Sequence, residues 1–562
     1  MQVATPISLA ATLLLVATSA MADEKSPKFR PPITRSKATT RVTGPLTKDG
    51  YIDYASVINQ RLSVGVTAEN NANVLIWKAM GPHPEQSNLG PRFFKLMKTE
   101  MLPETGDYFA ELGAFIKQEL KLKPTEPRWN EIVDQQSEAT SHPWTEQQYP
   151  NLAAWLKFNE KPLVVLREAT LRPRYFSPLI VESEEDVDQL HGGLITALLP
   201  GVQSTRSFAR ALSARAMLHL ANNRPKAAWE DILTCQRLGR LVAEGPTLIE
   251  ALVGIAIGGI ASDATLVYIE HVNPDAEQSA LLARQLEKLL PLPRMVDRIE
   301  LCERFMYLDI TQRVAGTGGN NLELLRNMIG HSGQKDNWFK KSLTKFTLRL
   351  TDWDLVLTKG NEAYDEITAA LRVKDPIARR AAIDRFDRSI SERAKQFRNP
   401  LQLLWRITAS ESAGEGLGSV VGDIMISLLL PALSACQAAE LRAFQLQDNL
   451  QVALALSAYH AEQGKYPTTL ADLKPKYLKE LPIDRFSGKA LIYQPTQEGY
   501  LFYSVGRNET DDQGRWSDDQ PAGDDLRVRM PRKAKSNRDQ QHRAYQTSVA
   551  SQAIRPSMGR PW

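Results

Sequence analysis

Apolar residues recur at helical spacing along most of this chain. From Phe208 to Leu220 an apolar side chain stands at every fourth position, as expected for one face of a helix. The polar turn at 222–225 ends that stripe, and a second stripe begins near Lys226. The pattern predicts a helical hairpin over residues 205–244.

The same spacing extends well beyond this hairpin. It predicts a mostly α protein, an irregular stack of helical hairpins that forms one domain over residues 50–420. The small-residue packing of the 205–244 hairpin resembles a tetratricopeptide unit, although no period of about 34 residues recurs elsewhere. The other helical stretches are 72–80, 150–170, 276–310, 353–371 and 376–397.

The string GPTLIEALVGIAIGGIA at 245–261 resembles the peptidase-recognition site of type IV pilins, but it also has a structural explanation. Thr247 and Glu250 have the spacing of a capping box, in which each side chain accepts from the other's backbone amide. The apolar run at 251–261 is about eleven residues, short of the roughly 20 that cross a bilayer. We therefore predict a capped, buried helix whose glycines let a neighbouring helix approach closely: Gly254, Gly258 and Gly259.

The pattern changes after residue 420. A long helical stretch ends at Gly464, and the segments 490–494 and 500–504 are rich in Leu, Ile, Tyr and Phe, as strands are. Residues 525–530 supply a third strand. We expect a small α+β domain over residues 421–530, with a long helix and an antiparallel sheet.

Residues 424–526 contain three short motifs in a fixed order: Gly464-Lys465-Tyr466-Pro467, then Leu481-Pro482, then Asp484, Phe486 and Gly488. In these motifs the region resembles the soluble domain of the pseudopilins of type II secretion, above all the major pseudopilin. That family is processed at a Gly followed by a Glu in its apolar helix, and the matching stretch here, 410–414, reads SESAG. Asp423 also places a charge beside the short apolar run. We therefore expect neither cleavage nor filament assembly.

The N-terminus has the features of a secretory signal. An apolar run is followed by Ala20-Met21-Ala22, a small-x-small cleavage pattern, so residues 1–22 are predicted to be a signal peptide. The protein is then exported to the periplasm, cell envelope or medium, with no transmembrane helix after cleavage. An uncleaved N-terminal anchor is the alternative, because no Lys or Arg precedes the apolar run. Residues 23–49, basic and rich in Pro and Thr, are predicted to be a disordered linker.

Charge is concentrated at the other end. The formal net charge is +4, yet residues 527–562 hold nine Lys and Arg against one acid, Asp539. The body therefore presents no surface expected to bind nucleic acid. Residues 531–562 are predicted to be a disordered basic tail, which makes an envelope protein or an anionic envelope polymer the expected partner.

Cysteine usage adds little. The chain has three cysteines, an odd number without paired spacing, and each follows or interrupts an apolar stretch. We expect Cys235, Cys302 and Cys436 to be buried thiols rather than members of a disulfide framework.

The acidic loop at 504–526 is the candidate ligand site. Seven acids fall within residues 509–525. In the pseudopilins that this region resembles, the corresponding loop binds calcium through carbonyl and carboxylate oxygens. The resemblance therefore implies a calcium site, and a solvated acidic loop is the alternative. The residues it assigns are Asn508, Asp511, Asp512 and Asp525.

One stretch offers carboxylates to an enzyme. In RIELCERFMYLDI the charges Glu300, Glu303, Arg304 and Asp309 interrupt an apolar helix, and two carboxylates could serve a secreted glycosidase-like hydrolase. Charges at helical spacing are more often ion pairs. No nucleotide-binding, metalloprotease or Gly-x-Ser-x-Gly motif occurs in the chain. We therefore expect a secreted, non-catalytic cell-envelope protein: a helical scaffold with a pseudopilin-like interaction module.

Overall fold

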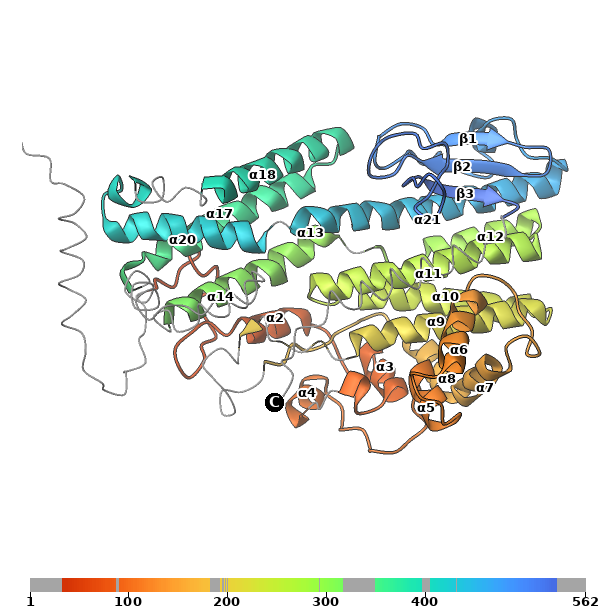
Figure 1. The fold of residues 1–562 in the computed structure, drawn as a ribbon, viewed down its shortest axis with the longest axis horizontal. Helices are drawn as coiled ribbons and strands as arrows, with labels where there is room; N and C mark the ends of the chain where they lie inside the picture. The colour runs from red at the N-terminus through yellow and green to blue at the C-terminus, as the bar shows by residue number, and fades with distance from the viewer. Residues whose placement is uncertain are drawn as a thin grey trace, which may run out of the picture.

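The computed structural model is mostly helical, with a small antiparallel sheet at one end (Figure 1). The predicted fold class is confirmed. The signal peptide predicted at 1–22 and the tail beyond residue 532 lie outside the described residues. Those residues are 33–86, 90–181, 193, 194, 197, 199, 201–292, 294–316, 349–396, 405–430 and 432–532.

The described part of the predicted linker is not a linker. Residues 33–49 lie against a helix much later in the chain, and Thr40 is buried. The Asn361 side-chain amide donates to the carbonyl oxygens of Ala38 (2.8 Å) and Thr39 (2.7 Å). Composition suggested disorder, but a buried amide satisfies the backbone of this segment and holds it in place.

Short helices form the N-terminal part of the body. Pro or Asn stands at the start of several of them, where the fixed φ of proline or a side-chain acceptor suits the first turn. They are α2 (Tyr54–Leu62), α3 (Ala72–Met80), the 3₁₀ turn Pro84–Gln86, α4 (Pro91–Leu96), α5 (Leu112–Gln118), α6 (Pro127–Ala139), α7 (Pro150–Phe158) and α8 (Glu160–Ala169).

The predicted hairpin is present. Helix α9 (Val202–Ala221) and helix α10 (Pro225–Val242) pack on each other and on α11 (Leu248–Val272). The capping box that begins α11 is also confirmed: Glu250 N donates to Thr247 Oγ1 (3.2 Å), and Thr247 N donates to Glu250 Oε2 (3.1 Å).

Helix α11 is longer than its apolar run suggested. It spans 25 residues and, by length and composition alone, is long and apolar enough to cross a membrane. More than half of its most apolar window is buried among α9, α10 and α21 (Ala432–Gln463). The length argument against a membrane span was therefore wrong, and burial is what identifies α11 as a core helix.

The glycines of α11 have different roles. A Cβ on Gly254 would lie 2.4 Å from the carbonyl oxygen of Gly239 on α10, so these two glycines allow the helices to touch. A Cβ on Gly258 or Gly259 would meet no atom within 4 Å. The prediction of close approach therefore holds for Gly254 and is wrong for Gly258 and Gly259.

A second group of helices extends the stack along the long axis of the molecule (Figure 1). The three cysteines are buried and form no disulfide, as predicted, with Cys302 and Cys436 in this second core. Helix α12 (Ala276–Glu287) belongs to the first group, since its Leu282 and Leu286 lie in the same core as α9 and α10. The helices of the second group are α13 (Met295–Arg298), a π-helical turn (Ile299–Glu303), α14 (Arg304–Gly316), α17 (Trp353–Arg372), α18 (Pro376–Gln396) and α20 (Ala413–Leu429).

The C-terminal region has the predicted order of elements. Helix α21 is followed by a 3₁₀ turn (Leu470–Leu473), β1 (Ile492–Pro495), β2 (Tyr500–Ser504) and β3 (Leu526–Met530). The strands form one antiparallel sheet in the order β1-β2-β3, with Phe502 opposite Val528. We call residues 432–532 the sheet module.

The sheet module does not have a core of its own. The expected boundary between residues 420 and 421 falls inside α20. Helix α21 packs on both α11 and α12, and Phe502 belongs to the same buried cluster as Ala209 and Ile257. The module is therefore continuous with the helical body rather than an independent domain.

Candidate metal centre

The acidic loop joins β2 to β3 and is held together at its two ends. Gly506 has φ +69°, and a Cβ there would lie 2.2 Å from the carbonyl oxygen of Asp524. Only glycine allows the two ends to come so close. Further along, the backbone amide of Asp525 donates to the carbonyl oxygen of Arg515 (3.0 Å). The loop is therefore folded back on itself.

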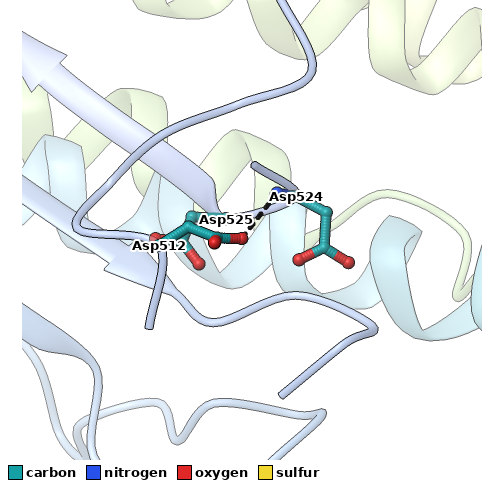
Figure 2. Close-up of side chains that lie close together, drawn as sticks. All are labelled: Asp512, Asp524 and Asp525. Carbon is teal, nitrogen blue, oxygen red and sulfur yellow. Dashed lines mark hydrogen bonds between the residues drawn. The ribbon is translucent and has the colours of Figure 1, made fainter. Parts of the chain in front are cut away.

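Three carboxylates meet where the loop closes. One carboxylate oxygen from each of Asp512, Asp524 and Asp525 lies within 4.8 Å of the other two. Figure 2 shows these side chains and the hydrogen bond from the backbone amide of Asp524 to Asp512 Oδ2, which is 3.1 Å long. Calcium bonds oxygen at about 2.3–2.6 Å, so oxygens up to roughly twice that distance apart can share one ion.

Asp525 is the least satisfied member of this acidic cluster. Its side chain is 0% exposed, and Oδ2 accepts a hydrogen bond from Gly514 N at 2.7 Å. Oδ1 of Asp525 and Oδ1 of Asp524 are buried without a hydrogen-bond partner in the part of the chain that the structure describes. Buried carboxylate oxygens ordinarily have a donor or a cation beside them.

The pKa values of Asp525 and Asp512 reflect this crowding of carboxylates. Burial, together with the charges of Asp512 and Asp511, raises the pKa of Asp525 to about 6. The pKa of Asp512 is lowered, because its carboxylate accepts hydrogen bonds from the Asn508 side chain and the Asp524 backbone. The cluster therefore holds negative charge at neutral pH, which Arg515 offsets only in part: its Nη2 lies 3.8 Å from Asp512 Oδ1, and the pKa of Asp525 is nevertheless raised.

Of the four residues assigned to the calcium site from the sequence, the structure places two in the acidic cluster and two outside it. Asp512 and Asp525 belong to the acidic cluster. Asp511 lies outside it, and its Oδ1 accepts from the Tyr503 hydroxyl (2.9 Å) and from Gln513 N. Asn508 contributes indirectly, since its Nδ2 donates to Asp512 Oδ2 (3.0 Å) while its Oδ1 accepts from Thr510 N.

Asp524 was missed as a ligand. The run of acids signalled it, but the resemblance pointed to Asp525, the acid just before the last strand. In a regular strand neighbouring side chains point to opposite faces. In the folded loop both Asp524 and Asp525 belong to the cluster, and only the tertiary structure shows it.

Glu300 and Asp309, two of the three carboxylates proposed for an enzyme, are engaged in ion pairs. Buried Arg304 lies 3.1 Å from Glu300 Oε2 and 2.8 Å from Asp365 Oδ1. Asp309 is also buried, and its Oδ2 lies 3.0 Å from Arg313 Nε and accepts from Leu194 N. These contacts fit helix packing.

Glu303 stands apart from these ion pairs. Burial raises its pKa.

Comparison of the chain with family models, with curated proteins and with solved structures finds no match.

Proposed function

We propose that this chain is a secreted, non-catalytic cell-envelope protein in which a helical scaffold carries a pseudopilin-like module with a calcium site. The proposal is supported by the long α21 followed by an antiparallel sheet, with an acidic loop between its last two strands. A glycosidase-like hydrolase is the weaker proposal, because the Glu300 and Asp309 carboxylates both pair with arginines.

The observation that carries the calcium site is the pair of buried carboxylate oxygens without a donor, on Asp524 and Asp525. A bound calcium ion would be held by these two residues and Asp512, with the remaining oxygen ligands supplied by backbone or water. Its charge offsets three carboxylates that otherwise repel one another. The ion would therefore stabilise the closed loop and the start of β3.

This loop also contacts the helical body. Glu509 forms an ion pair with Arg380 of α18, and Arg380 also donates to the carbonyl oxygen of Arg507 (3.4 Å). A calcium ion that fixes the loop would fix the surface that the sheet module and α18 present together. We propose that this combined surface is where an envelope protein or an anionic envelope polymer binds.

The first test is calorimetry of the full chain, since the sheet module shares its core with α11 and α12. Calcium at a hundred times its Kd should stabilise the protein by about 2.7 kcal/mol relative to a chelator. Magnesium should do much less, because it dehydrates reluctantly and requires octahedral geometry. Asp525→Asn should abolish the calcium effect. The matched Asp511→Asn variant, outside the acidic cluster, should keep it.

Measuring the calcium affinity as a function of pH makes this test more specific. Because the pKa of Asp525 is about 6, protons compete with calcium below that pH. The affinity should fall roughly tenfold per pH unit below 6 and stay level above it. A melting temperature that millimolar calcium leaves unchanged at pH 7.5 would show that the acidic cluster binds no calcium.

Export is tested separately. The mature protein should begin at Asp23 when its N-terminus is read by mass spectrometry from a fractionated culture. A chain that keeps residues 1–22 in the membrane fraction supports the anchored alternative. Intact protein found in the cytoplasm contradicts the proposal.

A further inference from the structure

Arg515 is the one basic residue that pairs with the acidic cluster in the part of the chain that the structure describes. Its Nη2 lies 3.8 Å from Asp512 Oδ1, and its side chain is 36% exposed. Neither Asp524 nor Asp525 forms an ion pair with any described residue. One guanidinium group is thus set against three carboxylates, and it is exposed enough to turn into solvent.

The backbone fixes Arg515 beside the cluster. Its amide donates to the carbonyl oxygen of Asp512 (3.2 Å), and its own carbonyl oxygen accepts from the Asp525 amide (3.0 Å). A Cβ on Gly523 would lie 2.6 Å from that carbonyl oxygen, so glycine is what allows the chain to pass so close. Both hydrogen bonds join Arg515 to members of the cluster, and its side chain therefore starts from a fixed point next to them.

The guanidinium group itself makes only a loose ion pair. At 3.8 Å its contact with Asp512 is longer than a hydrogen bond, and Arg515 Nε is buried without a hydrogen-bond partner among the described residues. The bidentate pair that arginine and a carboxylate often form is not made here. Oδ1 of Asp524 and Oδ1 of Asp525 are also left without a partner in that part of the chain. Arg515 therefore brings positive charge to the cluster without occupying these oxygens.

We propose that Arg515 sets the cation affinity and the charge preference of the acidic cluster, as an internal counter-ion that a bound metal ion must displace or tolerate. This inference rests on the proposed calcium site. While the cluster is empty, the guanidinium group offsets part of the repulsion between the carboxylates; once a metal ion is bound, it repels that ion. Both effects weaken binding, and the second grows with the charge of the ion.

The size of the repulsion follows from the distances. Calcium bonds oxygen at about 2.4 Å, so an ion on Asp512 Oδ1 lies at most about 6 Å from Arg515 Nη2. A unit charge and a divalent ion about 6 Å apart in water repel by an energy equal to roughly a tenfold change in affinity. Because this energy is proportional to the charge of the ion, the change for a trivalent ion is roughly thirtyfold.

The test is isothermal titration of the full chain with calcium and with terbium, a trivalent ion of similar radius. Arg515→Gln should bind calcium about tenfold and terbium about thirtyfold more tightly than the unaltered protein does. Arg515→Met removes the same charge with a different side chain and should give the same gains. The matched control is Arg515→Lys, which keeps the charge and should leave both affinities close to those of the unaltered protein.

Melting temperatures provide a second measurement. In a chelator both neutral variants should melt below the unaltered protein, because the carboxylates lose their counter-ion, and saturating calcium should raise their melting temperatures by more. Unchanged or weaker calcium binding by the neutral variants would overturn the proposal. Equal gains for calcium and terbium would also overturn it, since they would indicate a change in the shape of the loop rather than in its charge. If neither the unaltered protein nor the neutral variants bind calcium, the calcium site itself fails, and this inference fails with it.

Discussion

Two buried aspartates of this protein are surrounded in opposite ways. Asp423 on α20, 4% exposed, lies 2.8 Å from Lys359 Nζ and 2.5 Å from Arg406 Nη2, with Arg393 Nη1 at 3.5 Å. Asp525, 0% exposed, accepts a hydrogen bond from the Gly514 amide and has other carboxylates as its neighbours. Within the described residues, one carboxylate has an excess of cations and the other has none beside it.

The contrast shows where the chain supplies its own counter-ions. At Asp423, rigid helices bring cations from α17, α18 and the segment before α20 to one point. At Asp525 and at Arg240 no such partner arrives, although both groups are as deeply buried. Since burial without compensation costs free energy, we interpret the site at Asp423 as structural and, in line with the proposed function, the acidic cluster as a place for a cation.

The largest effect is expected at the compensated site. Asp423→Ala leaves three cations facing one another without the carboxylate, so the free energy of unfolding should fall by about 3–5 kcal/mol. Urea unfolding followed by circular dichroism measures it. Asp384→Ala is the matched control, because that side chain is exposed and lies 3.8 Å from Arg380, where about 0–1 kcal/mol is expected. Equal losses in the two variants would contradict the contrast.

A third buried carboxylate, Glu250, offers a pH test. Burial raises its pKa from 4.5 to about 7, opposed by hydrogen bonds from Thr247 and by the charge of Arg298. The folded state therefore holds the proton more tightly than the unfolded state. The stabilisation is complete below pH 4.5 and is lost as the pH rises to about 7, by about 3 kcal/mol.

The prediction for Glu250 is tested by comparing the free energy of unfolding of the unaltered protein with that of Glu250→Gln. Glutamine at this position also forms a capping box, so Glu250→Gln should keep the helix start but lose this part of the pH dependence. Urea unfolding of both proteins between pH 4.5 and 8 gives the difference curve, and the other titrating groups cancel in it. A flat difference curve would show that Glu250 keeps its usual pKa.

The smallest effect concerns the other half of the same capping box. Thr247→Ala removes the hydroxyl that accepts from Glu250 N and donates to Glu250 Oε2. The expected loss is about 1 kcal/mol, whereas Thr247→Ser should lose much less because it keeps the hydroxyl. If alanine and serine gave the same loss, packing of the Thr247 methyl group would be the cause instead of the cap.

Local patterns predicted the elements well. The hairpin of α9 and α10, the capping box of α11 and the strand Tyr500–Ser504 are where the spacing of residues placed them. These features depend on contacts between residues a few positions apart. The same reasoning failed at residues 33–49, where composition suggested a linker and a distant amide, Asn361, holds the segment.

The candidate site was predicted in outline only. An acidic loop is visible in the sequence, and Asp512 and Asp525 were chosen from it. Which oxygens lack donors depends on how the loop closes, and that closure brings Asp524 into the cluster while Asp511 turns to Tyr503. Spacing along the chain carries no information on that closure.

The sequence by itself determined that this is a mostly helical protein with a small C-terminal sheet and buried cysteines outside any disulfide, because periodicity and burial follow from neighbouring residues. Tertiary structure alone decided which buried charges are paired. Arg240 reaches Gln447, 207 positions away, and finds no acid there, whereas Asp423 finds three cations on other segments. Coulomb and desolvation energies depend on distance and burial in space, and the order of residues in the chain specifies neither directly.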